Sequence, residues 1–353
     1  MALADTIDIP ARLSRRAVMM IALGAVVIMF IVLELTLGPV SLSVHDILAS
    51  LIGNAEQAAQ AIITQIRAPR VATGLCVGVG LALAGGTMQG LLRNPLADPG
   101  LIGVTGGASL GAVLVIVLGE QLFSGIPDPI RPYLLPLAAF IGAGIVTSLV
   151  FVISRRGGYT SVATLILAGV AVNSIAGAVI GVMVYMSDDR QLRDLTFWSM
   201  GSLARSDWTV VGVTVVVTAA SAVAFLRLNR ALDLFQLGER AAFHTGLDVE
   251  RIKFRAGVLT AIVVGTITAA AGPIGFIGLI APHMARMIMG PGHKWMMPAS
   301  ALIGTAVILA ADLGVRMAIP PAEPPIGLAT SLIGGPFFLY LLLARMKGGQ
   351  GLV

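Results

Sequence analysis

The stretch from Arg67 to Gly111 constrains the fold more than any other part of the chain. It is apolar and rich in glycine from Val71 to Gly86, polar with two prolines from Leu92 to Pro99, and then apolar again. Only backbone that is hydrogen-bonded to itself can cross a bilayer, so this pattern predicts two membrane helices separated by a break. Glycine destabilises a helix in water, but in a membrane it allows neighbouring helices to approach closely.

The composition of the whole chain agrees with a polytopic membrane protein. Of its 353 residues 57% are hydrophobic and 12% are charged, and the mean hydropathy is +0.93. Soluble domains typically have about 25% charged residues. A helical span needs about 20 apolar residues, so we expect an all-α protein with about ten spans in one transmembrane domain, residues 1–353. The expected spans are 17–37, 68–91, 100–119, 133–153, 161–186, 208–228, 256–272, 275–290, 297–318 and 326–346.

The distribution of basic residues sets the expected topology. With the N-terminal tail, residues 1–16, in the cytoplasm, 16 of the 23 lysines and arginines fall on the cytoplasmic side. Cytoplasmic loops are enriched in these residues, so we expect both termini inside. The same topology explains the net charge of +5 without nucleic-acid binding. Seven arginines remain outside: Arg67, Arg70, Arg131, Arg190, Arg193, Arg205 and Arg316.

No catalytic or metal-binding pattern is visible. The four histidines lack a ligand spacing such as HxxxH, and the single cysteine, Cys76, can neither build a zinc site nor form an internal disulfide. There is no phosphate-binding loop of the GxxxxGK type. We therefore expect no enzyme activity and no bound cofactor in this chain, so any ATP must be hydrolysed by a separate partner.

Several segments resemble the permease subunits of iron-siderophore, haem and cobalamin ABC importers, the FecCD family. These segments are RAPR at 67–70, GLLRNPLADPGLIGVTGGASLGA at 90–112, GPIGFIGLIAPHMAR at 272–286 and PPIGLATSLIGGPFFLYLLL at 324–343. The resemblance implies a homodimer in the bacterial inner membrane. It also implies two ATPase subunits that bind ATP and magnesium, and a periplasmic binding protein that delivers the ligand.

The cargo is less defined than the family. The segment QLRDLTFWSMGSL at 191–203 is most similar to haem-transporting members, so haem is the first choice. A ferric siderophore or cobalamin is the alternative within the family. The alternative class is a secondary transporter coupled to an ion gradient, which would need ionisable residues at mid-membrane. Few are present, because Asp312 and Glu34 lie toward span ends.

The longest polar cytoplasmic segment, 229–255, alternates charged and apolar residues at helical spacing. Glycines interrupt it, so two short helices that meet at a glycine bend are expected. The segment resembles the family's coupling loop, which implies contact with the ATPase; a solvated loop is the alternative. The expected coupling residues are Leu237, Gly238, Glu239, Ala242, His244 and Gly246.

The expected fifth span has small residues at four-residue spacing, which places them on one helix face. They either pack against another helix or form a smooth wall of a translocation pathway. Met183 and Tyr185 near the outer end could contact a large flat ligand. The expected pathway residues are therefore Gly169, Asn173, Gly177, Gly181, Met183 and Tyr185.

The outer segment 187–207 and the remaining outer arginines suggest two further sites. Arg190 and Arg193 are expected at the ligand entrance, unless they pair with nearby aspartates. Arg67, Arg70 and Arg316 are expected to form a cationic rim that docks the binding protein. Lipid phosphates are the alternative partners, and Arg316 could instead pair with Asp312, four residues before it.

Two smaller predictions concern architecture. Residues 67–186 and 254–346, expected spans 2–5 and 7–10, could be inverted repeats. Ser43 could cap a short amphipathic helix outside the membrane.

Overall fold

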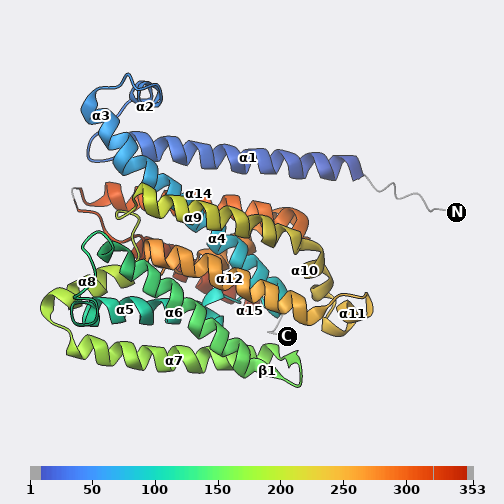
Figure 1. The fold of residues 1–353 in the computed structure, drawn as a ribbon. Coiled ribbons are helices and arrows are strands. Elements are labelled where there is room, and N and C mark those ends of the chain that lie inside the picture. The colour runs from blue at the N-terminus through green and yellow to red at the C-terminus, as the bar shows by residue number, and fades with distance from the viewer. Residues whose placement is uncertain (1–8, 321, 348–353) are drawn as a thin grey trace.

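The computed structural model describes residues 9–320 and 322–347 (Figure 1). Within these residues, eight helices are long and apolar enough to cross a membrane, and two shorter apolar helices, α13 and α15, complete the ten expected spans. The all-α prediction is confirmed. The ten helices are α1 (Ile9–Thr36), α4 (Ala68–Leu92), α5 (Val104–Leu122), α6 (Arg131–Ser154), α7 (Val162–Met186), α9 (Trp208–Arg227), α12 (Val249–Ala271), α13 (Ile277–Met289), α14 (His293–Ala318) and α15 (Ile326–Lys347).

Short elements lie at the two ends of the bundle. At one end are α2 (Val44–Leu51), α3 (Gln57–Ala61) and α8 (Asp189–Ser199); at the other are α10 (Asn229–Gln236), α11 (Glu239–His244) and a hairpin of β1 (Arg155–Arg156) and β2 (Tyr159–Thr160) (Figure 1). The first turn of α1 lies at the second end, which we call the cytoplasmic end in accordance with the charge distribution. Ser43 caps α2 as predicted. Its side chain accepts a hydrogen bond from the backbone N of Asp46, and the Asp46 side chain accepts one from the backbone N of Ser43.

Helix α4 is the centre of the bundle and packs against α14, α13, α9 and α12. Its glycines are required by these close approaches. A Cβ atom at Gly78 would lie 2.4 Å from Thr305 Cα, and one at Gly85 would lie 1.9 Å from the Gly278 carbonyl oxygen. The glycine-rich composition of this span is therefore a packing requirement, as the sequence indicates.

The predicted break after α4 is present. Arg93 ends the helix in the left-handed conformation, and the chain then turns through the 3₁₀ helix η2 (Pro99–Ile102) before α5 begins. A π-helical segment, η1 (Ile62–Arg67), leads directly into α4. Helices α12 and α14 begin several residues earlier than predicted because each has a polar first turn. The inverted repeat stays a prediction.

Candidate transport pathway and coupling surface

The small-residue stripe of α7 divides into a packed part and an open part. Gly169 is buried, and a Cβ atom there would lie 1.7 Å from the Leu101 carbonyl oxygen. Gly177 and Gly181 are exposed, with no atom within 4 Å of an added Cβ. Close packing therefore explains the first glycine, and an open helix face explains the other two.

Asn173 connects α7 to the break between α4 and α5. Its Nδ2 donates to the Gly100 carbonyl oxygen at 3.0 Å, while its Oδ1 has no hydrogen-bond partner among the described residues. Gly106 is small enough to leave room for this amide, since a Cβ atom there would lie 2.2 Å from Oδ1. The amide thus holds the break against the middle of α7.

A cavity of about 470 Å³ adjoins this contact, between α5, α7, α12 and the segment that begins α13. Gly177 and Asn173 line it, together with the side chains of Asp98, Thr105 and Thr268. Asp98 lies in the break, outside the spanning helices. Burial raises the pKa of its carboxyl, and the hydrogen bond from Gly100 N at 2.7 Å partly opposes this shift. The cavity can therefore accept a ligand with both apolar and polar groups.

The other predicted ligand contacts lie near the outer end of α7. Met183 is half-buried beside the apolar cluster of Val113 and Leu195, whereas Tyr185 is 90% exposed. Arg190 and Arg193 are exposed on α8, and the ion pairs of residues 9–320 and 322–347 do not include them. The predicted alternative of local pairing with aspartate is not observed.

A leucine at Gly177 should leave the fold intact and reduce transport, because it would fill part of the cavity without a clash. Gly169→Ala should instead lower the yield of folded protein, since its Cβ meets a backbone oxygen. Size-exclusion chromatography measures the yield of folded protein, and uptake by proteoliposomes measures transport. Gly144→Leu is the control, because Gly144 lies on α6, away from the cavity, with no atom within 4 Å of an added Cβ. Normal transport by Gly177→Leu would remove this face from the pathway.

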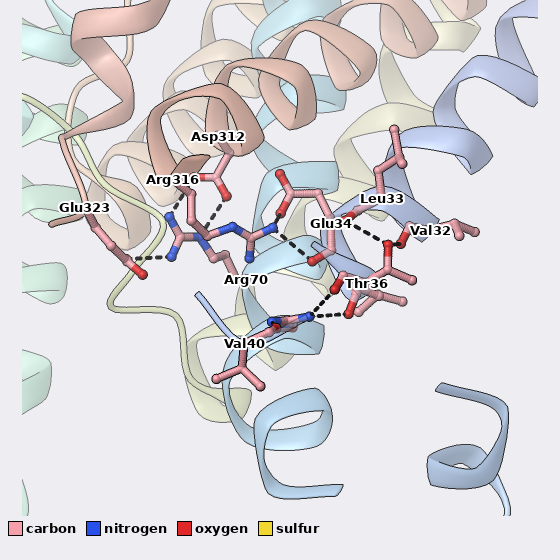
Figure 2. A network of polar contacts seen from close by, with 11 residues as sticks. Val32, Leu33, Glu34, Thr36, Val40, Arg70, Asp312, Arg316 and Glu323 are labelled. Atoms are coloured by element: carbon pink, nitrogen blue, oxygen red, sulfur yellow. Dashed lines mark hydrogen bonds and ion pairs between the residues drawn. The ribbon is translucent and has the colours of Figure 1, made fainter. Parts of the chain in front are cut away.

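Three of the outer arginines are buried near the outer ends of α1, α4 and α14. Figure 2 shows the charge network that Arg70 and Arg316 form there. Arg70 binds Asp312 through two hydrogen bonds of 2.7 and 3.0 Å and Glu323 through one of 2.6 Å. Arg316 pairs with Glu34 at 2.5 Å. Arg67 donates to the carbonyl oxygens of Leu35, Thr36 and Val40, around the end of α1.

The prediction of an exposed cationic rim is wrong in this structure. Arg67, Arg70 and Arg316 are only 3%, 4% and 3% exposed. A buried charge is costly unless it is paired, so each guanidinium takes carboxylates or carbonyls from other segments. Asp312 and Arg316 do not pair with each other either, since both bind partners outside α14. The role of these arginines in docking stays a prediction.

Glu34, to which the sequence assigned no function, is fully buried in this network. Glu323, between α14 and α15, reaches back to Arg70. The sequence contained a signal for this network, because the number of carboxylates near the outer span ends equals the number of arginines there. The carboxylates are Glu34, Asp312 and Glu323, and the arginines are Arg67, Arg70 and Arg316. Spacing along the chain alone did not show which of them pair.

The predicted coupling segment forms two short helices, α10 and α11, as expected. They meet at Gly238, whose φ of 105° is in a region that favours glycine, and α11 ends before Gly246, with a φ of 83°. Leu237 and His244 are exposed, and Glu239 is partly exposed. Ala242 is fully buried, so its side chain is not available for contact with another protein in this conformation. The role of these residues in coupling stays a prediction.

One contact of this segment was missed by the sequence reasoning. Asp233 on α10 accepts from the backbone N of His293 at 2.9 Å and lies 2.7 Å from its Nδ1. His293 is the first residue of α14, so the carboxylate caps that helix from another element. The coupling segment is thereby fixed to the same helix that carries the outer charge network.

Comparisons with known proteins agree on one family. Residues 26–344 match the FecCD transport family. The chain is 40% identical to the hemin transport system permease protein HmuU of Yersinia pestis, covering 93% of this chain and 97% of that protein. It is 39% identical to the cobalamin import system permease protein BtuC of Halobacterium salinarum, covering 82% and 75%. A structure described as an inward-facing metal-chelate type ABC transporter superimposes with a TM-score of 0.82 at 33% identity, covering 92% and 99%.

Proposed function

The chain belongs to the FecCD transport family, and we propose that it forms the membrane pathway through which an ABC importer carries haem. In this proposal two copies enclose the pathway in a bacterial inner membrane, and two ATPase subunits bind at the α10–α11 end. The observation that carries it is the joint presence of an open α7 face beside a cavity and a pair of short helices at the cytoplasmic end.

The choice of haem rests on chemistry near the outer end of α7. Haem has two carboxylates and a flat apolar ring. Arg190 and Arg193 are exposed cations that suit the carboxylates, and Tyr185 offers an exposed aromatic ring. Similarity alone supports haem and cobalamin almost equally, since HmuU and BtuC are 40% and 39% identical to the chain.

A soluble binding protein would deliver the cargo to the end that carries α8. We propose the exposed face of α8 for this contact in preference to Arg67, Arg70 and Arg316, whose side chains are buried. The buried arginines would then act only by holding the shape of that end.

An ion-coupled transporter is the weaker alternative. Such a transporter needs an ionisable group that can bind and release its ion within the membrane. Glu34 and Asp312 are instead paired with Arg316 and Arg70.

The cargo assignment is tested by reconstitution with an ATPase and a binding protein from the same gene cluster. Haem, a ferric siderophore and cobalamin are offered separately, with ATP inside the vesicles. We expect haem accumulation that requires ATP and falls when Arg190 and Arg193 are both changed to glutamine. Transport of cobalamin without haem would overturn the cargo, while ATP-independent uptake driven by an ion gradient would overturn the importer class.

A further inference from the structure

A groove of about 820 Å³ opens at the cytoplasmic end of the bundle, beside the coupling helices. It lies between the β1–β2 hairpin, helix α11 and the first turns of α12. The lining residues that carry the argument are Tyr159, Thr160, Glu239, Phe243, Glu250 and Lys253. The hairpin that forms one wall is far from α11 in the sequence and has no role in the function proposed above.

A buried lysine at the base of the groove connects the hairpin, α11 and α12 through hydrogen bonds. Lys253 Nζ on α12 donates to the Thr160 carbonyl oxygen at 2.7 Å, to Glu239 of α11 at 2.7 Å and to Glu250 at 3.2 Å. Glu250 in turn accepts from Thr160 N at 2.8 Å. Lysine is seldom buried unless it is paired, and here its three partners fix the hairpin and α11 relative to each other.

The sides of the groove carry large aromatic side chains that residues 9–320 and 322–347 leave exposed. Tyr159 on the hairpin is 74% exposed, and Phe243 on α11 is 66% exposed. Both side chains line the same groove as Lys253. Aromatic residues are enriched at protein–protein interfaces, and tyrosine is among the residues that contribute most to the binding energy there.

We propose that the β1–β2 hairpin forms a second part of the ATPase-binding surface. In this proposal Tyr159 and Phe243 both contact one apolar side chain of the ATPase, which lies in the groove above Lys253. This inference rests on the proposed importer function, and the groove is continuous with the coupling helices that carry it. A lipid acyl chain is a poor occupant because the groove contains Lys253, Glu239 and Glu250.

The test measures the affinity of the purified ATPase for the full chain, once in nanodiscs and once in detergent. Tyr159→Ala and Phe243→Ala should each weaken binding about thirtyfold, the lower limit for interface hot spots. Tyr133→Ala is the matched control, because this tyrosine is 44% exposed in the first turn of α6, at the opposite end of that helix from the hairpin. It should bind the ATPase as tightly as the native chain.

Lys253 provides a second, independent test of the joined groove. Lys253→Met keeps an apolar stem of similar length but releases the hairpin from α11, so it should weaken binding and make the further effect of Tyr159→Ala small. Lys253→Arg, which keeps a donor, should restore part of the affinity. If the hairpin binds the ATPase, the losses of affinity caused by Lys253→Met and Tyr159→Ala should therefore not be additive in the double variant.

The outcomes separate this inference from the function on which it rests. Native affinity of Tyr159→Ala, with weakened binding by Phe243→Ala, would overturn the binding role of the hairpin and leave the importer assignment intact. A Tyr159→Ala defect seen in nanodiscs but absent in detergent would also overturn it, because the tyrosine would then be a lipid contact. Failure of the native chain to bind any ATPase from its gene cluster would overturn the proposed function itself.

Discussion

Asp312→Ala is expected to lower the free energy of unfolding by about 3–5 kcal/mol, the usual cost of removing one partner from a buried ion pair. Asp312 holds Arg70 through two hydrogen bonds, and both side chains are almost fully buried. Without the carboxylate, the guanidinium keeps only Glu323, which is partly exposed. Unfolding in mixed micelles, followed by circular dichroism, measures the loss.

The charge itself can be separated from the packing with a double variant. Arg70→Met combined with Asp312→Leu removes both buried charges and should be much less harmful than Asp312→Ala, because the carboxylate that loses its partner, Glu323, is partly exposed to solvent. The control is Asp128→Ala, which removes an ion pair with Arg131 that is largely exposed to solvent. It should leave stability nearly unchanged. Equal losses for Asp128→Ala and Asp312→Ala would show that burial does not decide the effect.

The network also explains how the first helix is held. Of the α1 side chains from Arg15 to Thr36, only Val27 and Glu34 are buried, and the main helical neighbour of α1 is α14. Glu34 anchors its outer end to Arg316, and Arg67 binds its last carbonyl oxygens (Figure 2). At the other end of α14, Asp233 caps the helix from α10. Helix α14 is therefore held by polar contacts at both of its ends. The coupling segment contacts its N-terminal end, and the charge network contacts its C-terminal end.

The spans could be predicted from the sequence, but the pairs inside the network could not. Hydrophobic length and glycine or proline breaks are local signals, and they indicated each of the ten helices and the break at Arg93. Arg70 and Asp312 are 242 residues apart, and Arg316 and Glu34 are 282 apart. A local pattern favoured Asp312 with Arg316, yet tertiary packing supplied better partners for both.

The α7 stripe shows a similar limit. The helix advances about 40° beyond a full turn with every four residues, because a turn has 3.6 residues. Gly169 and Gly181 therefore point about 120° apart, which is enough to place one against Leu101 and leave the other open. The spacing predicts that adjacent members share a face, but only the positions of the neighbouring helices show which members are packed.

Gly238→Pro should abolish transport while leaving the membrane bundle folded. Gly238 joins α10 to α11 with a φ of 105°, whereas proline is fixed near −65°. Its backbone N also donates to Phe235 O at 3.0 Å, a bond that proline cannot make. Helix α11 would therefore leave its position on Lys253, although no residue of the spanning helices changes. We expect at least a tenfold loss of ATP-driven uptake, with ATP hydrolysis by the partner no longer linked to transport.

The matched control for this change is Gly292→Ala, at the same end of the bundle. Gly292 has a φ of −68° and no atom within 4 Å of an added Cβ, so alanine fits there without strain. Gly238→Ala should be intermediate, because alanine at a φ of 105° is strained but keeps its N–H donor. Uptake and ATP hydrolysis are measured together in proteoliposomes for all three variants. If Gly238→Pro transports as well as Gly292→Ala, the angle between α10 and α11 does not carry the coupling, and the exposed side chains of the two helices act independently of it.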